Sequence, residues 1–543
     1  MRATDLEGSP RSAPIDLPDA PIGIVGAGTM GGGIAHVAAT GGFEVKLFDP
    51  AEGAAQKAVM RIGDFLQRAV QRGRMQPEPA QAALTRIEPC GSLDDLGDCF
   101  IVIEAVPEDL QLKRELFERL TIICGSDTVL ATNTSSIPVT SIASGIDRPA
   151  RVVGMHFFNP VPLMKLVEVI AGVNSGEIAL ATTREVARRM GREPIDANDG
   201  PGFLVNRCSR PFLLEAQRLL QERVADHETI DRIVRLGGGF RMGPFELSDL
   251  VGVDVGYDIA RSFYALGHNE PRWQPSNIAK QMVAAGRLGR KTRHGYYTYP
   301  ENGEYRSPDP PPQMAETASG MARIIGDSEL AGQIRRLAAA AGYELAGGDT
   351  PTPNGGFAIT VDARIYGAGD QLDPAAGPTA VLCAGRSLAT AARGRDFAGF
   401  HCLPPLGESH MVELTRGIGT SEITAAATAH FFHAIGRHVT WVADAPGLVL
   451  GRIVCQLINE AAFAVQEGVG SPADIDKGVQ RGLNFPRGLL SWADMIGINQ
   501  VVATIDALQH EIGGDRYRAA PWLRRMAAEG SNGRASGHGF YRY

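Results

Sequence analysis

The sequence predicts an α/β Rossmann-type domain with a parallel sheet, then an all-α domain, then a degenerate second α/β plus α copy. Three observations lead to this fold class. Short apolar strands alternate with helices over residues 21–198, which is typical of a parallel sheet with helices on both faces. Apolar residues recur at helical spacing over residues 199–300. An internal repeat relates the second half of the chain to the first.

The first domain opens with an apolar strand, a glycine-rich turn and a helix, and a second strand follows. Two further apolar strands flank a polar helix later in the domain. This order predicts successive β-α-β units. The expected elements are strand 22–25, turn 26–31, helix 30–40, strand 44–48, strand 99–106, helix 109–120 and strand 128–132.

The helical domain is predicted from three amphipathic segments, at residues 203–220, 227–236 and 245–266. The proline-rich stretch ENGEYRSPDPPPQ that follows is typical of a linker. The expected boundaries are a flexible tail 1–20, the sheet domain 21–198, the helical domain 199–300, the linker 301–318, a degenerate sheet domain 319–443 and a second helical domain 444–543.

The internal repeat has an offset of 245 residues. GMHFFNP at 154–160 aligns with GFHCLPP at 399–405, and GPGFLVNR at 200–207 aligns with APGLVLGR at 445–452. HGYYTY is matched by HGFYRY at the C-terminus, where the offset slips to 244. At an offset of 300, IVGAGTMG aligns with IIGDSELA, so the second sheet domain is about 55 residues shorter than the first.

Composition excludes several classes of protein. The 53 basic and 61 acidic residues give a net charge of −8, which argues against a general attraction to nucleic acid or membranes. No apolar run approaches the roughly 20 residues of a membrane span, and the N-terminal segment lacks the apolar core of a secretion signal. The seven cysteines are never spaced CxxC, which predicts buried thiols in a reducing compartment. We therefore expect a cytoplasmic protein.

The GAGTMG segment at 26–31 predicts a dinucleotide-binding loop. Gly26 permits a tight turn, Gly28 lets the backbone approach a pyrophosphate, and Gly31 lets the helix pack close to the strand. The helix N-terminus, at Thr29 and Met30, supplies amide donors to phosphates. Asp49, at the end of the next strand, would accept hydrogen bonds from ribose hydroxyls and repel a 2′-phosphate, which favours NAD over NADP. The alternative is a glycine-rich turn in an unrelated α/β protein.

A second motif, GMHFFNPVPLMKLVEV, predicts a hairpin with a turn at NPVP. If the hairpin is centred on Pro162, His156 and Glu168 face each other. A carboxylate at that distance orients an imidazole and stabilises its cationic form, which suits a general base. The spacing alone leaves a second interpretation equally open, namely a pair that only stabilises the hairpin.

These motifs together resemble the L-3-hydroxyacyl-CoA dehydrogenases over residues 20–300, through GAGTMG, ATNTSSI, HFFNPVPLMKLVE, GPGFLVNR and MGPFELSD. The duplicated half resembles the longer bacterial members of phenylacetate and 3-hydroxybutyryl-CoA metabolism. The resemblance implies reversible oxidation of a 3-hydroxyacyl-CoA to the 3-ketoacyl-CoA with NAD, in a cleft between the domains. It implies that His156 takes the hydroxyl proton and that Glu168 orients the His156 ring. It also implies that Ser135 holds the substrate oxygen and that Asn206 positions the substrate. It further implies cofactor contacts at Asn159, Glu108, Lys113 and Lys291.

Coenzyme A phosphates would meet a basic helix at residues 51–74. Lys57, Arg61, Arg68 and Arg72 recur at intervals that place them on one helical face. Arg72 falls where the similar family carries a lysine for this task, whereas Phe65 falls where it carries a serine. A solvated charged face is the other interpretation of this stripe.

The second copy keeps the His-Glu spacing at His401 and Glu413 but replaces Asn206 by Gly451 and GAGTMG by GDSELA. We therefore expect a catalytically silent half that does not bind NAD. Its helical domain would imitate the partner subunit of shorter dimeric family members, giving an intramolecular pseudo-dimer. Further association into a homo-oligomer is left open.

Two other functions are compatible with parts of the same sequence. One is a dehydrogenase of a free hydroxy acid such as gulonate, on the same scaffold. Another is a non-catalytic protein that binds CoA or NAD. A metal site at His430, His433 and His438 is not expected, because their counterparts in the first copy are ordinary surface charges.

Overall fold

The structure is a computed structural model that describes residues 15–302, 304–314, 317–347, 357–366, 370, 372 and 377–543. The chain divides into two compact units, of which the first contains the residues up to 207 together with 467–483. The second contains residues 208–466 and 484–543. Residues 467–483, which the sequence analysis places in the second helical domain, thus belong to the same compact unit as the first sheet domain. Most of the predicted tail lies outside the described residues.

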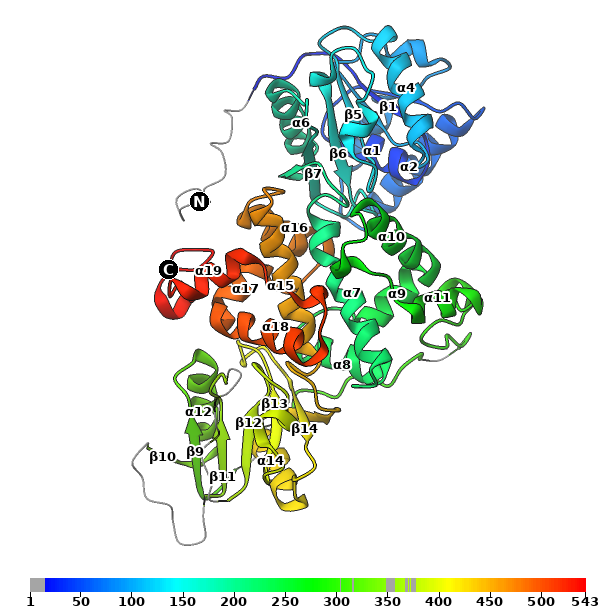
Figure 1. Ribbon diagram of the computed structural model, residues 1–543. Coiled ribbons are helices and arrows are strands. Elements are labelled where there is room, and N and C mark those ends of the chain that lie inside the picture. Colours follow the sequence, from blue (N-terminus) through cyan, green and yellow to red (C-terminus); the bar gives the residue numbers. More distant parts are fainter. Residues whose placement is uncertain are drawn as a thin grey trace. The chain divides into compact units, whose positions relative to one another are not determined.

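The first unit is built on an eight-stranded sheet in the order β3-β2-β1-β4-β5-β6-β7-β8 (Figure 1). All neighbouring strands are parallel except β6 and β7, which form an antiparallel hairpin. The strands are β1 Ile22–Val25, β2 Val45–Phe48, β3 Ile87–Pro89, β4 Ile101–Glu104, β5 Val129–Thr132, β6 Val152–Phe157, β7 Leu166–Ala171 and β8 Glu193–Asn198.

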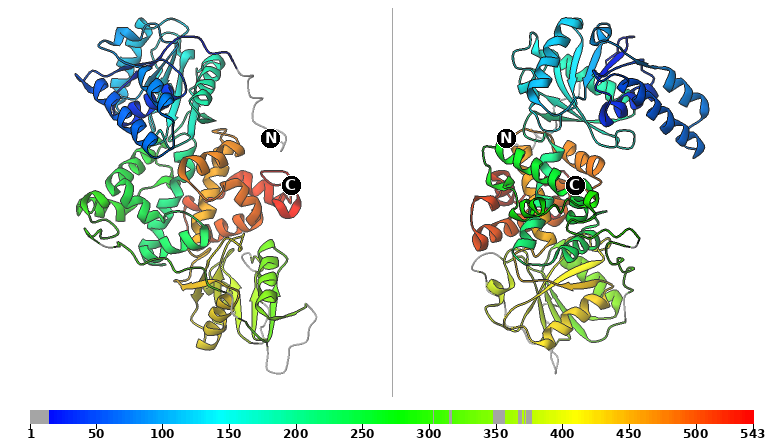
Figure 2. Two further views of the ribbon diagram at one scale, coloured as in Figure 1. Left: turned by 180° about the vertical axis from the view of Figure 1, so that it is seen from behind. Right: turned by 90° about the vertical axis from the view of Figure 1, so that its right-hand side faces the viewer.

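Helices cover both faces of this sheet (Figures 1 and 2). On one face, buried side chains of four helices share a core with alternate strand residues such as Ile24 and Ile103. On the other face, Phe117 and Leu120 of α4 are fully buried. The helices of the shared core are α1 Thr29–Thr40, α2 Ala54–Gln71, α3 Pro77–Thr85 and α6 Glu177–Arg189, and α4 is Leu110–Ile123.

The helical region begins with α7, Val205–Gln221, whose first residues belong to the first unit. The segment predicted as one helix over 245–266 is two helices, because Gly252 adopts a φ of 109° that ends the first of them. The remaining helices of this region are α8 His227–Gly238, α9 Pro244–Val251, α10 Val253–Leu266 and α11 Asn277–Ala284.

The second unit contains a seven-stranded sheet in the order β10-β9-β11-β12-β13-β14-β15. Helices α12 and α14 pack into one core on a single face of it, as α1 and α6 do in the first sheet. The described residues hold no counterpart of α2 or α3. The elements are β9 Met321–Ile325, α12 Glu329–Ala341, β10 Glu344–Ala346, β11 Ile359–Asp362, β12 Thr379–Leu382, β13 Ala398–His401, β14 Met411–Arg416, α14 Glu422–Ala434 and β15 His438–Trp441.

The C-terminal helices repeat the arrangement of the first helical region. Asp249 accepts hydrogen bonds from the Tyr296 and Tyr297 amides, and Asp494 accepts the equivalent bonds from Phe540 and Tyr541. Among the described helices, none is long and apolar enough to cross a membrane. The C-terminal helices are α15 Leu450–Gln466, α16 Pro472–Leu483, α17 Leu489–Ile496, α18 Ile498–Ile512 and α19 Pro521–Ala528.

The two copies contact each other reciprocally. The Asn198 amide donates to the Val469 carbonyl at 2.7 Å, and the equivalent Ala443 amide donates to the Val224 carbonyl at 2.9 Å. Helix α16 of the second copy packs on β7 and β8, and α8 of the first copy packs on β14. Residue i contacting j while j contacts i is the pattern of a two-fold isologous interface.

Candidate active site

The β6–β7 hairpin brings His156 directly opposite Glu168, as the sequence predicts. The His156 Nδ1 lies 2.6 Å from the Glu168 Oε2, and both side chains are buried. This contact assigns the proton to Nδ1 and leaves Nε2 as the ring acceptor. The hairpin therefore presents an imidazole in the form that can take up a proton.

Glu168 is itself fixed by the start of α7. Its Oε1 accepts hydrogen bonds from the amides of Leu204 at 3.1 Å and Val205 at 2.9 Å. A helix N-terminus favours a negative charge, so these amides stabilise the ionised carboxylate. The GPGFLVNR motif thus contributes to the His-Glu pair through its backbone, and its Asn206 lies half-buried in the first turn of α7.

The ATNTSSI loop follows β5 and is held by Glu108. Its Oε1 accepts from the Thr134 hydroxyl at 2.6 Å, the Ser135 amide at 3.2 Å and the Ser136 hydroxyl at 2.8 Å. Burial alone would raise the pKa of Glu108, but these hydrogen bonds and the Lys113 charge together lower it. Glu108 therefore shapes the loop on which Ser135 stays exposed.

Lys113 is buried and lies 2.6 Å from Glu104 and 3.3 Å from Glu108. The second oxygen of Glu104 accepts from the Thr132 hydroxyl at 2.6 Å. These contacts tie the ends of β4 and β5 to α4. Sequence reasoning missed Glu104, which stands inside an apolar strand segment, and its only signal was a carboxylate in a buried strand that requires a partner.

Asn133 is a second residue that the sequence analysis did not single out. Its Oδ1 accepts from the Phe157 amide at 2.9 Å, next to His156. The amide side chain thus ties the ATNTSSI loop to β6. It lay within a motif already quoted, but nothing in its spacing pointed to this partner.

The glycine loop has the features that a pyrophosphate requires. Gly26 has a φ of 103°, and a Cβ on Gly31 would lie 1.7 Å from the Gly26 carbonyl oxygen. A Cβ on Gly28 would meet no described atom within 4 Å, and among the described residues no side chain caps the N-terminus of α1. The loop therefore fits the phosphates of a dinucleotide at the amides of Thr29 and Met30.

Asp49 and Arg61 hold Ala27 of this loop from its two sides. The Ala27 amide donates to Asp49 at 2.7 Å, and the Arg61 guanidinium donates to the Ala27 carbonyl at 2.8 Å. Each carboxylate oxygen can accept a second hydrogen bond, so Asp49 retains capacity for a ribose hydroxyl. Arg61 thus contacts the dinucleotide loop, whereas the sequence analysis groups it with residues expected to contact coenzyme A.

Two family profiles match this chain. The profile described as 3-hydroxyacyl-CoA dehydrogenase, NAD binding domain, matches residues 21–200. The profile of the C-terminal domain matches twice, at residues 202–299 and 447–543. The chain belongs to the 3-hydroxyacyl-CoA dehydrogenase family. The duplicated helical domain predicted from the repeat is thereby confirmed.

Relatives and solved structures agree with this family. A 3-hydroxyadipyl-CoA dehydrogenase of Escherichia coli K12 is 34% identical over 506 residues, which are 93% of this chain and 97% of the relative. A probable 3-hydroxybutyryl-CoA dehydrogenase of Deinococcus radiodurans is 41% identical over 51% of this chain and 99% of its own length. A crystal structure of an Escherichia coli 3-hydroxybutyryl-CoA dehydrogenase superposes with a TM-score of 0.80 at 31% identity, covering 94% of this chain and 99% of that one. The predicted fold class and NAD-dependent 3-hydroxyacyl-CoA dehydrogenase activity are confirmed.

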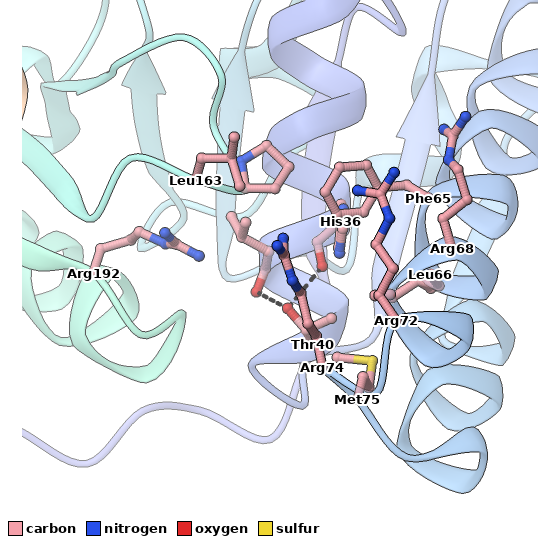
Figure 3. A pocket seen from close by; sticks show the side chains of 13 residues that line it. His36, Thr40, Phe65, Leu66, Arg68, Arg72, Arg74, Met75, Leu163 and Arg192 are labelled. Carbon is pink, nitrogen blue, oxygen red and sulfur yellow. Dashed lines mark hydrogen bonds between the residues drawn. The ribbon is translucent and has the colours of Figure 1, made fainter.

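The dehydrogenase has a basic cavity of about 540 Å³ in its first unit (Figure 3). Arg68 and Arg72 of the predicted stripe line it, joined by Arg74 and, from the opposite side, Arg192. Lys57 is exposed and is not among the described lining residues. The fold therefore divides the predicted stripe, and only its C-terminal end faces the cavity.

An aromatic pair forms another wall of this cavity. His36 and Phe65 meet edge to face, with ring centroids 4.9 Å apart. Burial, and then the nearby Arg192 charge, lowers the pKa of His36 to about 4, so this ring is neutral at physiological pH. His36, Arg74 and Arg192 were missed from the sequence because three separate segments bring them together.

Two further residues were predicted to contact the cofactor, Asn159 and Lys291. Asn159 is exposed at the end of β6. Lys291 belongs to the second unit, where its ammonium pairs with Asp254 at 2.6 Å. That pair occupies Lys291 in the present structure.

The second copy of the dehydrogenase keeps the hairpin but changes the pair. His401 Nδ1 is 3.8 Å from Glu413, and neither ring nitrogen has a hydrogen-bond partner in the described part of the chain. Glu413 still accepts from the Val449 and Leu450 amides, as Glu168 does from its own helix. A Cβ on Gly451 would lie 2.3 Å from the His401 ring. No side chain therefore fits where Asn206 stands in the first copy.

In the second copy, the loop that replaces GAGTMG accepts hydrogen bonds from a side chain of α12. The Arg335 guanidinium donates to the carbonyls of Gly326 and Ile324. The matching position in the first copy is Ala35, which is fully buried. Elsewhere in this copy, His438 donates to the Pro311 carbonyl at 2.8 Å, and no cluster of metal-ligating side chains occurs among the described residues.

Proposed function

We propose that the first copy oxidises an L-3-hydroxyacyl-CoA to the 3-ketoacyl-CoA with His156 as the general base. The hydroxyl proton of the substrate passes to the His156 Nε2. The hydrogen at C3 leaves with its electron pair, for which NAD would be the acceptor. The products are the ketone, NADH and a proton. The observation that carries this proposal is the buried 2.6 Å contact between His156 and Glu168, because it fixes the ring tautomer and supports the imidazolium that forms.

Neighbouring residues are assigned by chemistry and by the family motif. Ser135 is exposed on a loop braced by Glu108, and its hydroxyl is proposed to hold the substrate oxygen. Asn206, in the first turn of α7, is proposed to position the substrate. Asn159 is proposed to lie against the nicotinamide ribose. Together they would hold C3 and its hydroxyl in the geometry that the base requires.

NAD is proposed to bind at the glycine loop. Gly26, Gly28 and Gly31 leave room for the pyrophosphate, and the start of α1 supplies amide donors at Thr29 and Met30. Asp49 would accept the ribose hydroxyls and repel a 2′-phosphate. Glu108, Lys113 and Lys291 are the remaining proposed cofactor contacts. NAD, when bound, supplies the acceptor for the electron pair from C3.

Coenzyme A is proposed to bind the basic cavity. Arg72 lies where the family carries a lysine for this contact, and Arg68, Arg74 and Arg192 add charge around the same space. Guanidinium groups bind phosphates through paired hydrogen bonds. Lys57 and Arg61, which the sequence grouped with Arg72, have less support as CoA contacts. The relatives carry the names 3-hydroxyadipyl-CoA and 3-hydroxybutyryl-CoA dehydrogenase, which supports a short-chain thioester as substrate.

The second copy is proposed to be catalytically silent and to act as a built-in partner of the first. The loss of Gly28 and Gly31 from the loop, which Ser328 and Ala331 replace, and the separated His401–Glu413 pair support silence. The reciprocal contacts between the copies support an intramolecular pseudo-dimer. A cytoplasmic location is supported by the seven buried free cysteines.

The test is NADH absorbance with acetoacetyl-CoA, compared with free acetoacetate and gulonate. Wild type is expected to turn over the thioester, and His156→Ala to lose about 10²–10⁴ in kcat. His401→Ala is the matched control from the second copy and should keep full activity. Turnover of the free acid in preference to the thioester would favour the hydroxy-acid enzyme. Binding without turnover would favour the CoA or NAD sensor.

A further inference from the structure

Two carboxylates share one ammonium in the first unit of the enzyme. Glu104, the last residue of β4, is fully buried, and so is Lys113 of α4. The Lys113 ammonium lies 2.6 Å from Glu104 and 3.3 Å from Glu108. These three residues are termed the Glu104 cluster. With two anions and one cation, the cluster carries one negative charge in excess.

The surroundings of Glu104 hold it in the ionised form. Its Oε1 accepts a hydrogen bond from the Val106 amide at 2.7 Å besides contacting Lys113, and its Oε2 accepts from the Thr132 hydroxyl at 2.6 Å. Hydrogen bonds donated to a carboxylate favour its charged form. Burying such a charge is costly, and an apolar residue at this place in β4 would avoid the cost. The excess charge therefore fits a cationic group that a ligand brings to the cluster.

The position of the cluster in the sheet indicates which part of a dinucleotide it meets. In the order β3-β2-β1-β4-β5, the strand order reverses between β1 and β4, and a dinucleotide lies across the carboxyl ends of the strands at this point. Asp49 follows β2 on one side and is proposed to hold the adenosine ribose, so the nicotinamide half lies on the other side, over β4 and β5. The glycine loop touches that side directly, since a Cβ on Gly26 would lie 2.5 Å from the Ala105 carbonyl oxygen.

The two redox forms of the coenzyme differ in charge at the nicotinamide ring. The oxidised ring is a cation, whereas the ring of NADH is neutral because it has taken up a hydrogen with its electron pair. A nearby negative charge therefore attracts the oxidised ring and has no such effect on the reduced one.

We propose that the excess negative charge of the Glu104 cluster makes the first copy favour oxidised NAD over NADH. This inference rests on the proposed function, since it assumes that NAD binds at the glycine loop. Such a preference assists the uptake of oxidised NAD and the release of NADH, which is the direction of hydroxyacyl-CoA oxidation. Glu104 acts here as a positioning residue, because it holds Lys113 and adds its charge from behind the site.

The second copy, whose loop has lost its phosphate-binding glycines, has a different charge balance at the same place. The register of its sheet pairs Asp362 with Ile325, as Glu104 pairs with Val25 in the first copy. The Arg364 guanidinium donates two hydrogen bonds to the Asp362 carboxylate, at 3.0 and 2.7 Å. One acid meets one base, so this pair carries no net charge. The excess negative charge thus occurs in the copy that retains the dinucleotide loop.

The experiment measures the dissociation constants of oxidised NAD and NADH separately, by isothermal titration calorimetry on the full chain without acyl-CoA. Glu104→Gln removes the charge and keeps the shape, since its amide oxygen can accept from Val106 and its amide nitrogen can donate to the Thr132 hydroxyl. The ratio of the constant for oxidised NAD to that for NADH is expected to rise by about 5- to 10-fold. Glu104→Asp keeps the charge and should leave this ratio within about 2-fold of wild type, even where both affinities fall.

Glu118→Gln is the control, because it removes an exposed carboxylate from the same helix, α4, and should leave both constants unchanged. Asp362→Asn, the matched change in the second copy, should also leave them unchanged. Equal weakening of both coenzymes in Glu104→Gln would overturn the inference, since a loss of packing acts on both forms alike. If that variant does not fold, Glu108→Gln makes the same charge change at a side chain that is 38% exposed, and an unchanged ratio there would overturn the inference as well.

The same titrations separate this inference from the proposed function. If wild type binds neither form of the coenzyme, the proposed function itself fails. If wild type binds both forms and the ratio responds to neither glutamine variant of the cluster, only the inference on the Glu104 cluster fails.

Discussion

At the scale of single residues, Glu168 performs two tasks at once. One oxygen contacts His156, and the other accepts the first amides of α7. The pairing of Glu168 with His156 could be predicted because a turn centred on Pro162 fixes the register of the hairpin. The contact with α7 could not be predicted, since it depends on how the helix that follows β8 returns to the hairpin.

Replacing Glu168 by glutamine tests the charge of this residue. The amide oxygen can still accept from α7, but it no longer stabilises an imidazolium at His156. We expect kcat for acetoacetyl-CoA reduction to fall by about 100-fold or more with little change in the KM for NADH. Glu413→Gln, the equivalent change in the second copy, should have no effect on kcat. An unchanged kcat in Glu168→Gln would show that the pair only stabilises the hairpin.

At the scale of elements, the basic face predicted for α2 forms as expected, but its two ends contact different parts of the molecule. The sequence predicts the stripe from Lys57 to Arg72, and α2 indeed forms as one helix. Its N-terminal part lies beside the glycine loop, where Arg61 donates to Ala27, whereas Arg68 and Arg72 reach the cavity. Periodicity fixes which residues share a face but not which neighbour each part of the face meets.

This division of α2 makes a kinetic prediction. Arg72→Gln should raise the KM for acetoacetyl-CoA by about 10-fold without changing the KM for NADH, because one phosphate contact is lost. Arg61→Gln should affect the other substrate: it should raise the KM for NADH and leave the KM for acetoacetyl-CoA unchanged, since it releases the glycine loop. Lys57→Gln is the control and should change neither value. Steady-state kinetics with each substrate varied in turn measure all three variants, and a rise in both KM values for Arg72→Gln would contradict the assignment.

At the scale of the whole molecule, the duplication predicted from the 245-residue offset accounts for most of the chain. Its reciprocal ion pairs could not be predicted, because they require knowing which surfaces of the two copies meet. Arg452 is fully buried and pairs with Glu222 at 2.5 Å, and it also contacts Glu215 at 3.0 Å. In the first copy the equivalent Arg207 pairs with Glu467 at 2.7 Å.

Arg452→Met should therefore destabilise the folded chain by about 2–3 kcal/mol, since it removes one of the two guanidinium groups that compensate the buried Glu215, the other being Arg218 at 2.5 Å. Urea unfolding followed by circular dichroism measures this change. Arg416→Met, which removes an exposed ion pair with Glu422, serves as the control and should cost less than about 1 kcal/mol. Equal urea midpoints of unfolding for the two variants would show that the ion pairs of Arg452 do not contribute to the stability of the folded chain.

The missing side chain at Gly451 has a consequence for the second copy. An asparagine there would collide with the imidazole of His401, because its Cβ alone would lie 2.3 Å from that ring. A second reactive centre would thus require both a side chain at position 451 and a different position of the His401 ring. A single substitution at Gly451 therefore does not rebuild in the second copy the arrangement of His156 and Asn206.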